Sequence, residues 1–171
     1  RMNQLTGDSK YIDVLERSLY NGALAGISLG GDRFFYVNPL ESKGDHHRQE
    51  WYGCACCPSQ LSRFLPSIGN YIYASSDDAL WVNLYIGNTG QIRIGETDIL
   101  LTQETDYPWD GSVKLTISTS QPLEKEIRLR IPNWCKTYDL SINGKRINVS
   151  EEKGYAVIKD WKSQDVIALD M

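Results

Sequence analysis

The sequence contains the run Val113-Lys114-Leu115-Thr116-Ile117-Ser118, in which branched apolar residues alternate with polar ones. Alternation with a period of two puts every apolar side chain on one face of an extended strand, so this run predicts a half-buried β-strand. The same period recurs in the run Ile127-Arg128-Leu129-Arg130-Ile131 and earlier in Leu80-Trp81-Val82-Asn83-Leu84-Tyr85-Ile86. These three runs decide the fold class, because each needs an apolar partner surface over one face only.

Further strands follow toward the end of the chain. Leu140-Ser141-Ile142 leads into Asn143-Gly144, which is a strong hairpin signal, and Ile147 and Val149 continue the pattern. Tyr155-Ala156-Val157-Ile158 and Val166-Ile167-Ala168-Leu169 each predict one more strand. Short, half-buried strands at this spacing predict an antiparallel β-sandwich over residues 70–171.

Residues 1–69 have a different period. Helix signals begin at Asp8, a preferred N-cap residue, continue through apolar positions 12, 15 and 19, and end at Asn21-Gly22. A second helix is predicted from Pro58 to Ile68, with apolar residues at helical spacing and Pro66 ending or kinking it. The sequence therefore predicts a mainly β chain with N-terminal helices and a boundary near residue 70.

Composition excludes some classes of partner. The 171 residues carry a net charge of −4 and no Lys/Arg cluster, which argues against nucleic acid and anionic membranes as partners. No apolar run approaches the roughly 20 residues that a membrane-spanning helix needs. The opening Arg1-Met2-Asn3-Gln4 has the character of neither a signal peptide nor a natural start, so we expect a piece of a longer protein. The oligomeric state is not specified by the sequence.

Three of the four cysteines fall within Cys54-Ala55-Cys56-Cys57-Pro58. Adjacent cysteines are badly placed to bridge one another, and Cys135 alone cannot pair with three thiols, so the cluster indicates metal binding or catalysis. With Pro58 at the first helical position, Cys57 is expected at the N-cap, where the helix dipole favours the thiolate. Zinc takes four ligands, so others would have to join; His46, His47 and Glu50 are candidates, although their charged surroundings favour a solvated loop.

The spacing of the cysteines leaves two interpretations equally open, a structural zinc site and a catalytic thiolate. A redox pair of Cys54 and Cys57 is weaker, because Cys56 would then have no role. A metal-bound thiolate persists in either cytoplasm or periplasm, so the compartment also stays open between these two.

Two linked motifs carry a resemblance to a known family. The run from Trp51 to Ser59, preceded by Phe34-Phe35-Tyr36-Val37-Asn38-Pro39-Leu40-Glu41, resembles glycoside hydrolase family 127, the β-L-arabinofuranosidases. The likeness extends over residues 1–20, which resemble the last stretch of that family's (α/α)6 barrel. It implies the end of a barrel catalytic domain over residues 1–69, followed by an antiparallel β-sandwich domain over residues 70–171.

The resemblance also implies a mechanism. Cys56 matches the family's nucleophile, Cys56 and Cys57 match zinc ligands, Tyr36 matches a sugar-contacting tyrosine, and Cys54 matches a cysteine to which no role is assigned. The implied activity is retaining hydrolysis of L-arabinofuranosides or related plant sugars in a bacterium. The family's acid/base glutamate and the Glu and Cys that complete its zinc site precede the position matched by Arg1, so the 171-residue chain alone is expected to be inactive.

An alternative from another class is a non-catalytic, zinc-stabilised β-sandwich module that binds carbohydrate or a partner domain. The predicted sandwich contains tryptophans of the kind that form a sugar-stacking platform, but packing in a core is the favoured interpretation of them. They are Trp81, Trp109, Trp134 and Trp161. Two departures from the family pattern, Ser59 in place of a proline and a short span between Leu40 and Glu50, leave the exact sugar open.

Overall fold

The computed structural model of the chain describes residues 1–54, 56–121 and 124–171. Helical segments lie mainly before residue 73. They are α1 (Met2–Thr6), α2 (Lys10–Ser18), a π turn (Leu19–Ala23), a 3₁₀ turn (Leu24–Gly26), α3 (Cys56–Phe64), a second 3₁₀ turn (Leu65–Ser67) and α4 (Gly69–Ile72).

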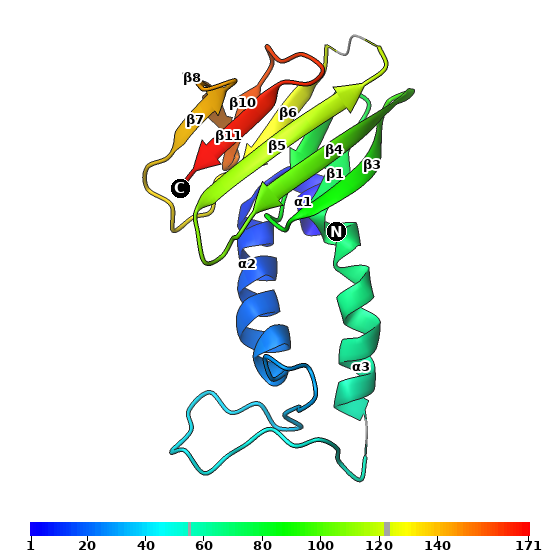
Figure 1. Cartoon of the computed structure of the whole chain (residues 1–171), viewed down its shortest axis with the longest axis vertical. Coiled ribbons are helices and arrows are strands. Elements are labelled where there is room, and N and C mark those ends of the chain that lie inside the picture. Colours follow the sequence, from blue (N-terminus) through cyan, green and yellow to red (C-terminus); the bar gives the residue numbers. More distant parts are fainter. Residues whose placement is uncertain (55, 122–123) are drawn as a thin grey trace. The chain divides into compact units, whose positions relative to one another are not determined.

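The strands that the structure describes all follow residue 72 (Figure 1). They are β1 (Tyr73–Ser75), β2 (Ala79–Val82), β3 (Asn88–Ile94), β4 (Thr97–Thr105), β5 (Ser112–Thr119), β6 (Glu126–Arg130), β7 (Asp139–Ile142), β8 (Lys145–Arg146), β9 (Ser150–Glu152), β10 (Tyr155–Ile158) and β11 (Val166–Asp170). Within the described residues they form a five-stranded sheet in the order β1-β2-β6-β10-β9 and a six-stranded sheet in the order β3-β4-β5-β11-β7-β8. Neighbouring strands are antiparallel except β2 and β6, which are parallel.

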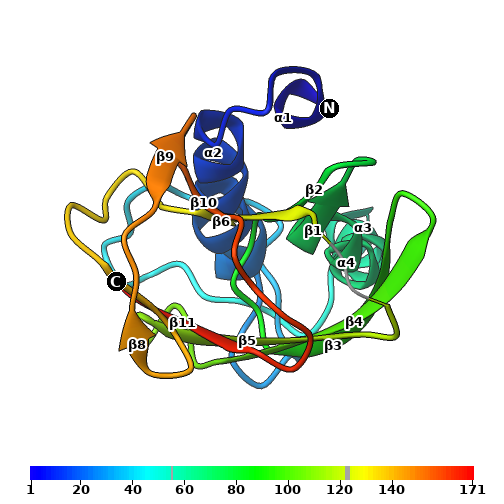
Figure 2. The same cartoon turned by 90° about the horizontal axis from the view of Figure 1, so that it is seen from above.

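The two sheets pack face to face as the layers of a sandwich (Figure 2). The alternating residues that predicted the strands supply the core between them: Val113, Leu115 and Ile117 are fully buried. Ile127 and Leu129 from the other sheet are also fully buried. Each such side chain contributes about 1.5–3 kcal/mol when it leaves water, so the predicted sandwich is confirmed and its core has the predicted origin.

The described residues divide into two compact units, which we call the sheet unit (residues 1–12 and 71–171) and the cysteine unit (residues 13–70). The first twelve residues join the sheet unit through specific contacts. Asn3 Nδ2 donates to the Tyr155 hydroxyl over 2.9 Å, and the Ser9 N–H donates to the Lys153 carbonyl over 2.9 Å. Gly154, with a φ of +78°, allows this approach, because a Cβ there would lie 1.9 Å from Ser9 Oγ.

Both predicted helices are present, with different ends. Asp8 Oδ1 accepts from the Lys10 N–H, but α2 begins at Lys10, so Asp8 lies one position before the N-cap and not at the N-cap, where it was predicted. The last predicted turn of this helix is a π turn. α3 ends at Phe64, and Pro66 lies in the 3₁₀ turn that follows, as its missing N–H requires. In the part of the chain that the structure describes, no helix combines the length and the apolar character of a membrane span.

Candidate active site

Two short backbone segments of the cysteine unit meet at Phe34. Its N–H donates to the Gln49 carbonyl over 2.8 Å, and its own carbonyl accepts from the Gln49 N–H over 2.9 Å. The next N–H, of Phe35, donates to the Gly26 carbonyl over 2.8 Å. These bonds fix the backbone just before Tyr36, whose side chain is 42% exposed.

The thiols of Cys56 and Cys57 lie beside Tyr36. The Cys56 Sγ is 3.3 Å from the Tyr36 hydroxyl oxygen, and the Cys57 Sγ is 3.8 Å from the Tyr36 carbonyl oxygen. α3 begins at Cys56, so the prediction that Cys57 is the N-cap is wrong: Cys57 is the second helical residue, and Pro58 still lies in the first turn. All four cysteines, each within the described residues, are free thiols.

The contact with Tyr36 shifts the acidity of both groups. A hydrogen bond from the Tyr36 hydroxyl, followed by the neighbouring Cys57 thiol, holds the pKa of Cys56 below its ordinary value. The same contact raises the pKa of Tyr36 to about 12. Burial, followed by the nearby Cys56 thiol, raises the pKa of Cys57, contrary to the expectation that the helix start would favour its thiolate. Of these two cysteines, Cys56 is therefore the one whose surroundings favour the nucleophilic form.

The spacing of the two sulfurs fits a shared zinc ion. Two sulfurs each about 2.3 Å from one tetrahedral zinc lie about 3.8 Å apart. The Cys56 and Cys57 sulfurs are 3.9 Å apart, and both residues lie in the first turn of α3. Zinc takes four ligands, so this pair of sulfurs would account for two of them. The described residues hold no group of three or more His, Cys, Asp or Glu side chains placed for a metal.

Two of the three other candidate ligands from the sequence have contacts elsewhere. The His46 ring stacks on Phe35 with centroids 4.8 Å apart, and its Nε2 is 2.8 Å from the Val37 carbonyl oxygen. Glu50 forms an exposed ion pair with Arg33 over 3.0 Å. His47 is exposed. The prediction of a solvated loop over these positions agrees with their placement, although the stacking of His46 was not foreseen.

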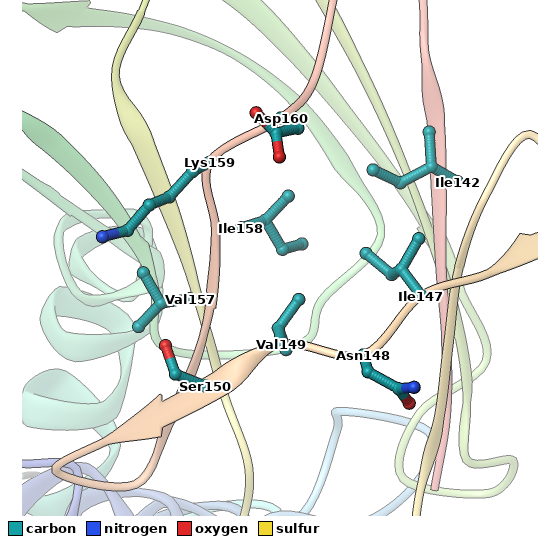
Figure 3. Close-up of a pocket in the computed structure, with 9 residues that line it drawn as sticks. All are labelled: Ile142, Ile147, Asn148, Val149, Ser150, Val157, Ile158, Lys159 and Asp160. Carbon is teal, nitrogen blue, oxygen red and sulfur yellow. The ribbon is translucent and has the colours of Figure 1, made fainter.

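A pocket of about 470 Å³ opens in the sheet unit (Figure 3). Its lining comes from the end of β7, the segment that joins β8 to β9, and β10 with the two residues after it. Isoleucine and valine side chains point toward its interior, and polar side chains lie around it (Figure 3). The residues that define this character are Ile142, Ile147, Val149, Ile158, Lys159 and Asp160. With one carboxylate and no thiol among these residues, it offers neither the carboxylate pair nor the nucleophile of a glycosidase site.

Two family models match the chain in succession. Residues 1–70 match the catalytic domain of GH127 beta-L-arabinofuranosidases, and residues 79–171 match the GH127 middle domain. The order of a catalytic-domain segment followed by a β domain agrees with the expected architecture.

Individual relatives agree with the family models. A non-reducing end beta-L-arabinofuranosidase of Bifidobacterium longum subsp. longum is 37% identical over 92% of this chain, which spans 26% of that protein. The crystal structure of a GH127 beta-L-arabinofuranosidase from Geobacillus stearothermophilus T6 is 44% identical, with a TM-score of 0.90 over 99% of this chain and 29% of that one. A further GH127 beta-arabinofuranosidase structure is 41% identical, with a TM-score of 0.92 over 99% of this chain and 30% of that one. With more than half its length matched by the middle-domain model alone and its fold shared throughout, the chain belongs to glycoside hydrolase family 127, the β-L-arabinofuranosidase family.

Proposed function

We propose that this chain forms part of a retaining glycoside hydrolase that cleaves L-arabinofuranosides or related plant sugars, with Cys56 as its nucleophile. The observation that carries the proposal is the 3.3 Å contact between the Cys56 Sγ and the Tyr36 hydroxyl, at an exposed thiol whose pKa is lowered by that contact. An exposed, activated thiolate is what nucleophilic catalysis requires. The names of the relatives supply the sugar class.

In the proposed reaction the Cys56 sulfur attacks the anomeric carbon, and the bond from that carbon to the leaving oxygen breaks. The leaving oxygen takes a proton from an acid group, which then removes a proton from the water that displaces the sulfur. Two displacements at one carbon return the original configuration. Tyr36 contributes by hydrogen bonding to the sulfur when it leaves as thiolate and by contacting the sugar from its exposed side.

Cys56 and Cys57 are proposed to hold a zinc ion, which the 3.9 Å sulfur spacing supports. When bound, zinc keeps the sulfur deprotonated at neutral pH. The chain spans 26% of its curated relative, and we propose that the acid/base group and the remaining zinc ligands come from other parts of a longer protein. On this proposal the 171 residues alone do not hydrolyse the substrate.

The experiment is to compare the longer protein with its Cys56→Ala variant on an aryl β-L-arabinofuranoside. Loss of activity by at least about 10³-fold is expected, because the covalent route then has no nucleophile. Cys135→Ala is the matched control, since Cys135 is a partly buried thiol of the sheet unit. Mass spectrometry of the protein quenched during turnover should find the sugar on Cys56. Full activity of Cys56→Ala would refute the assignment.

One observation favours the second function, carbohydrate binding by the sheet unit without catalysis. Trp109 is 89% exposed and Trp134 is 51% exposed, so neither indole has the core position that the sequence favoured, whereas Trp161 is buried. The ring of Trp134 stacks on Tyr107 with centroids 6.4 Å apart. Calorimetry of the 171-residue chain with arabino-oligosaccharides tests this function. Binding heat that Trp109→Ala abolishes is the expected result, and the absence of any binding heat in the unchanged chain would exclude the function.

A further inference from the structure

Tyr52 connects the segment that carries the thiols to the segment that carries Tyr36. It lies two residues before Cys54, and its hydroxyl donates to the Phe34 carbonyl over 2.9 Å. Its ring also packs against the ring of Tyr36, with centroids 5.5 Å apart and planes tilted by 53°. The two contacts are made by different parts of one half-buried side chain.

The Phe34 carbonyl is a shared acceptor at this connection. It accepts from the Gln49 N–H over 2.9 Å and from the Tyr52 hydroxyl over 2.9 Å. The bond from Gln49 sets the register between the backbone segments that contain Phe34 and Gln49. The bond from Tyr52 attaches the residues just before the thiols to the same carbonyl oxygen. Tyr52 therefore ties the segment just before Cys54 to the backbone two residues before Tyr36.

Tyr36 itself has much less to hold its side chain. Its ring is 42% exposed, and its hydroxyl meets the Cys56 sulfur at 3.3 Å. A tyrosine with solvent on one side changes χ1 and χ2 freely unless a neighbour restricts it, and the Tyr52 ring is such a neighbour. Displacement of a catalytic contact by about 1 Å costs as much as 10²-fold in rate, so the packing has a catalytic consequence.

We propose that Tyr52 is a positioning residue, which holds the Tyr36 side chain against the sulfur of Cys56 through ring packing and the hydrogen bond to Phe34. The inference rests on the proposed function, because it assigns Tyr52 to the same reaction. Tyr52 acts through Tyr36 and takes no part in bond making, which separates its expected signature from that of the nucleophile.

The test is a double-mutant cycle in the longer protein, with kcat and KM measured on an aryl β-L-arabinofuranoside. Tyr52→Leu removes both contacts and should lower kcat about 10- to 100-fold while KM changes less, because the misplaced group is one that acts in the transition state. Tyr52→Phe keeps the ring and should recover most of the rate, remaining about fivefold below wild type. In a Tyr36→Ala background neither Tyr52 variant should lower kcat further, because the side chain that Tyr52 positions is absent.

A purely structural role predicts a different result. If Tyr52 only stabilised the fold, its loss would be additive with Tyr36→Ala, and additive losses would overturn the inference, as would a kcat for Tyr52→Leu within twofold of wild type. If Tyr52→Leu does not fold, Tyr52→Phe carries the same cycle, because it deletes only the 2.9 Å bond. Tyr73→Phe is the control, a partly buried tyrosine of the sheet unit whose hydroxyl is also hydrogen bonded.

Cys56→Ala is measured in the same assay to keep the two ideas separate. Activity that survives Cys56→Ala overturns the proposed function whatever Tyr52 does. An inactive Cys56→Ala together with unaltered Tyr52 variants overturns only the positioning role.

Discussion

The sulfur of Cys56 and the hydroxyl oxygen of Tyr36 lie 3.3 Å apart, although the two residues are separated by twenty positions in the chain. The pKa of Cys56 is lowered and that of Tyr36 is raised to about 12, each with the other as its first cause. The shifts are opposite because the hydroxyl donates a hydrogen bond to the thiolate, whereas ionising both groups would place two negative charges side by side. One proton is therefore kept on oxygen so that the sulfur can lose its own.

Replacement of Tyr36 by Phe should move the reactivity of Cys56 to higher pH. The lost hydrogen bond favoured the thiolate, so the pKa of Cys56 rises and less thiolate is present at neutral pH. The measurement is the pH profile of iodoacetamide alkylation in metal-free protein, followed at Cys56 by peptide mass spectrometry. Tyr71→Phe, at a tyrosine that is 42% exposed, is the control. A profile identical to that of wild type would contradict the role of the hydroxyl.

Zinc content provides a second test, independent of turnover. The longer protein is expected to bind one zinc ion per chain, and Cys57→Ser should lower that content, because thiolate is the better zinc ligand. Elemental analysis by mass spectrometry after gel filtration measures the stoichiometry. Cys135→Ser should retain full occupancy. Equal zinc in Cys57→Ser and wild type would remove Cys57 from the ligand set.

Tyr155→Phe should destabilise the sheet unit. The Tyr155 hydroxyl accepts from Asn3 Nδ2 over 2.9 Å and donates to Asn83 Oδ1 over 2.7 Å, with all three residues buried. Its removal leaves a buried amide donor and acceptor short of a partner, which costs about 1–3 kcal/mol. Urea unfolding of the 171-residue chain measures the loss. The exposed change Tyr71→Phe should stay within about 0.5 kcal/mol of wild type, and an equally small effect at Tyr155 would show the hydroxyl to be dispensable.

Alkaline pH should destabilise the sheet unit through Tyr73. Burial raises its pKa from 10.0 to about 12, so between these values the unfolded chain releases a proton that the folded chain keeps. The contribution of Tyr73 is therefore complete below pH 10 and is lost as the pH rises toward 12. The free energy of unfolding, measured in urea at several pH values, should fall less steeply over this window in Tyr73→Phe. Parallel curves for the two proteins would assign the alkaline loss to other groups.

The sequence predicted the sandwich because the alternation of apolar and polar residues within each strand determines which side chains enter the core. Val113, Leu115 and Ile117 alternate with polar residues, and all three are fully buried. Asn143-Gly144 predicted a turn, and both residues have the positive φ that it requires. The hairpin of β3 and β4 was missed, although Ile92 and Ile94 before Gly95 carry the same alternation. The parallel pairing of β2 with β6 has no local signal, since it depends on which distant edges meet.

For the site, the sequence identified chemical groups and could not supply their neighbours. The cysteine cluster and Tyr36 were named from their motifs, and the structure brings Cys56, Cys57 and Tyr36 together. Tyr52 was not singled out, because an aromatic residue beside a motif is commonplace until its ring and hydroxyl are seen to have separate contacts. Likewise, the stack of His46 on Phe35 depends on a loop closing over eleven positions, which periodicity does not describe.

The attachment of residues 1–12 to the sheet unit bears on how members of this family exchange parts. The catalytic-domain match covers residues 1–70, yet Asn3 and Ser9 bond to Tyr155 and Lys153 near the far end of the chain. A graft that transplants residues 79–171 alone would bring a foreign surface against the host's Ser9, where even a methyl group on Gly154 collides. Chimeras between relatives should therefore take residues 1–12 and residues 79–171 from the same parent. Hybrids built in this way should fold, because the contacts between the two segments are kept.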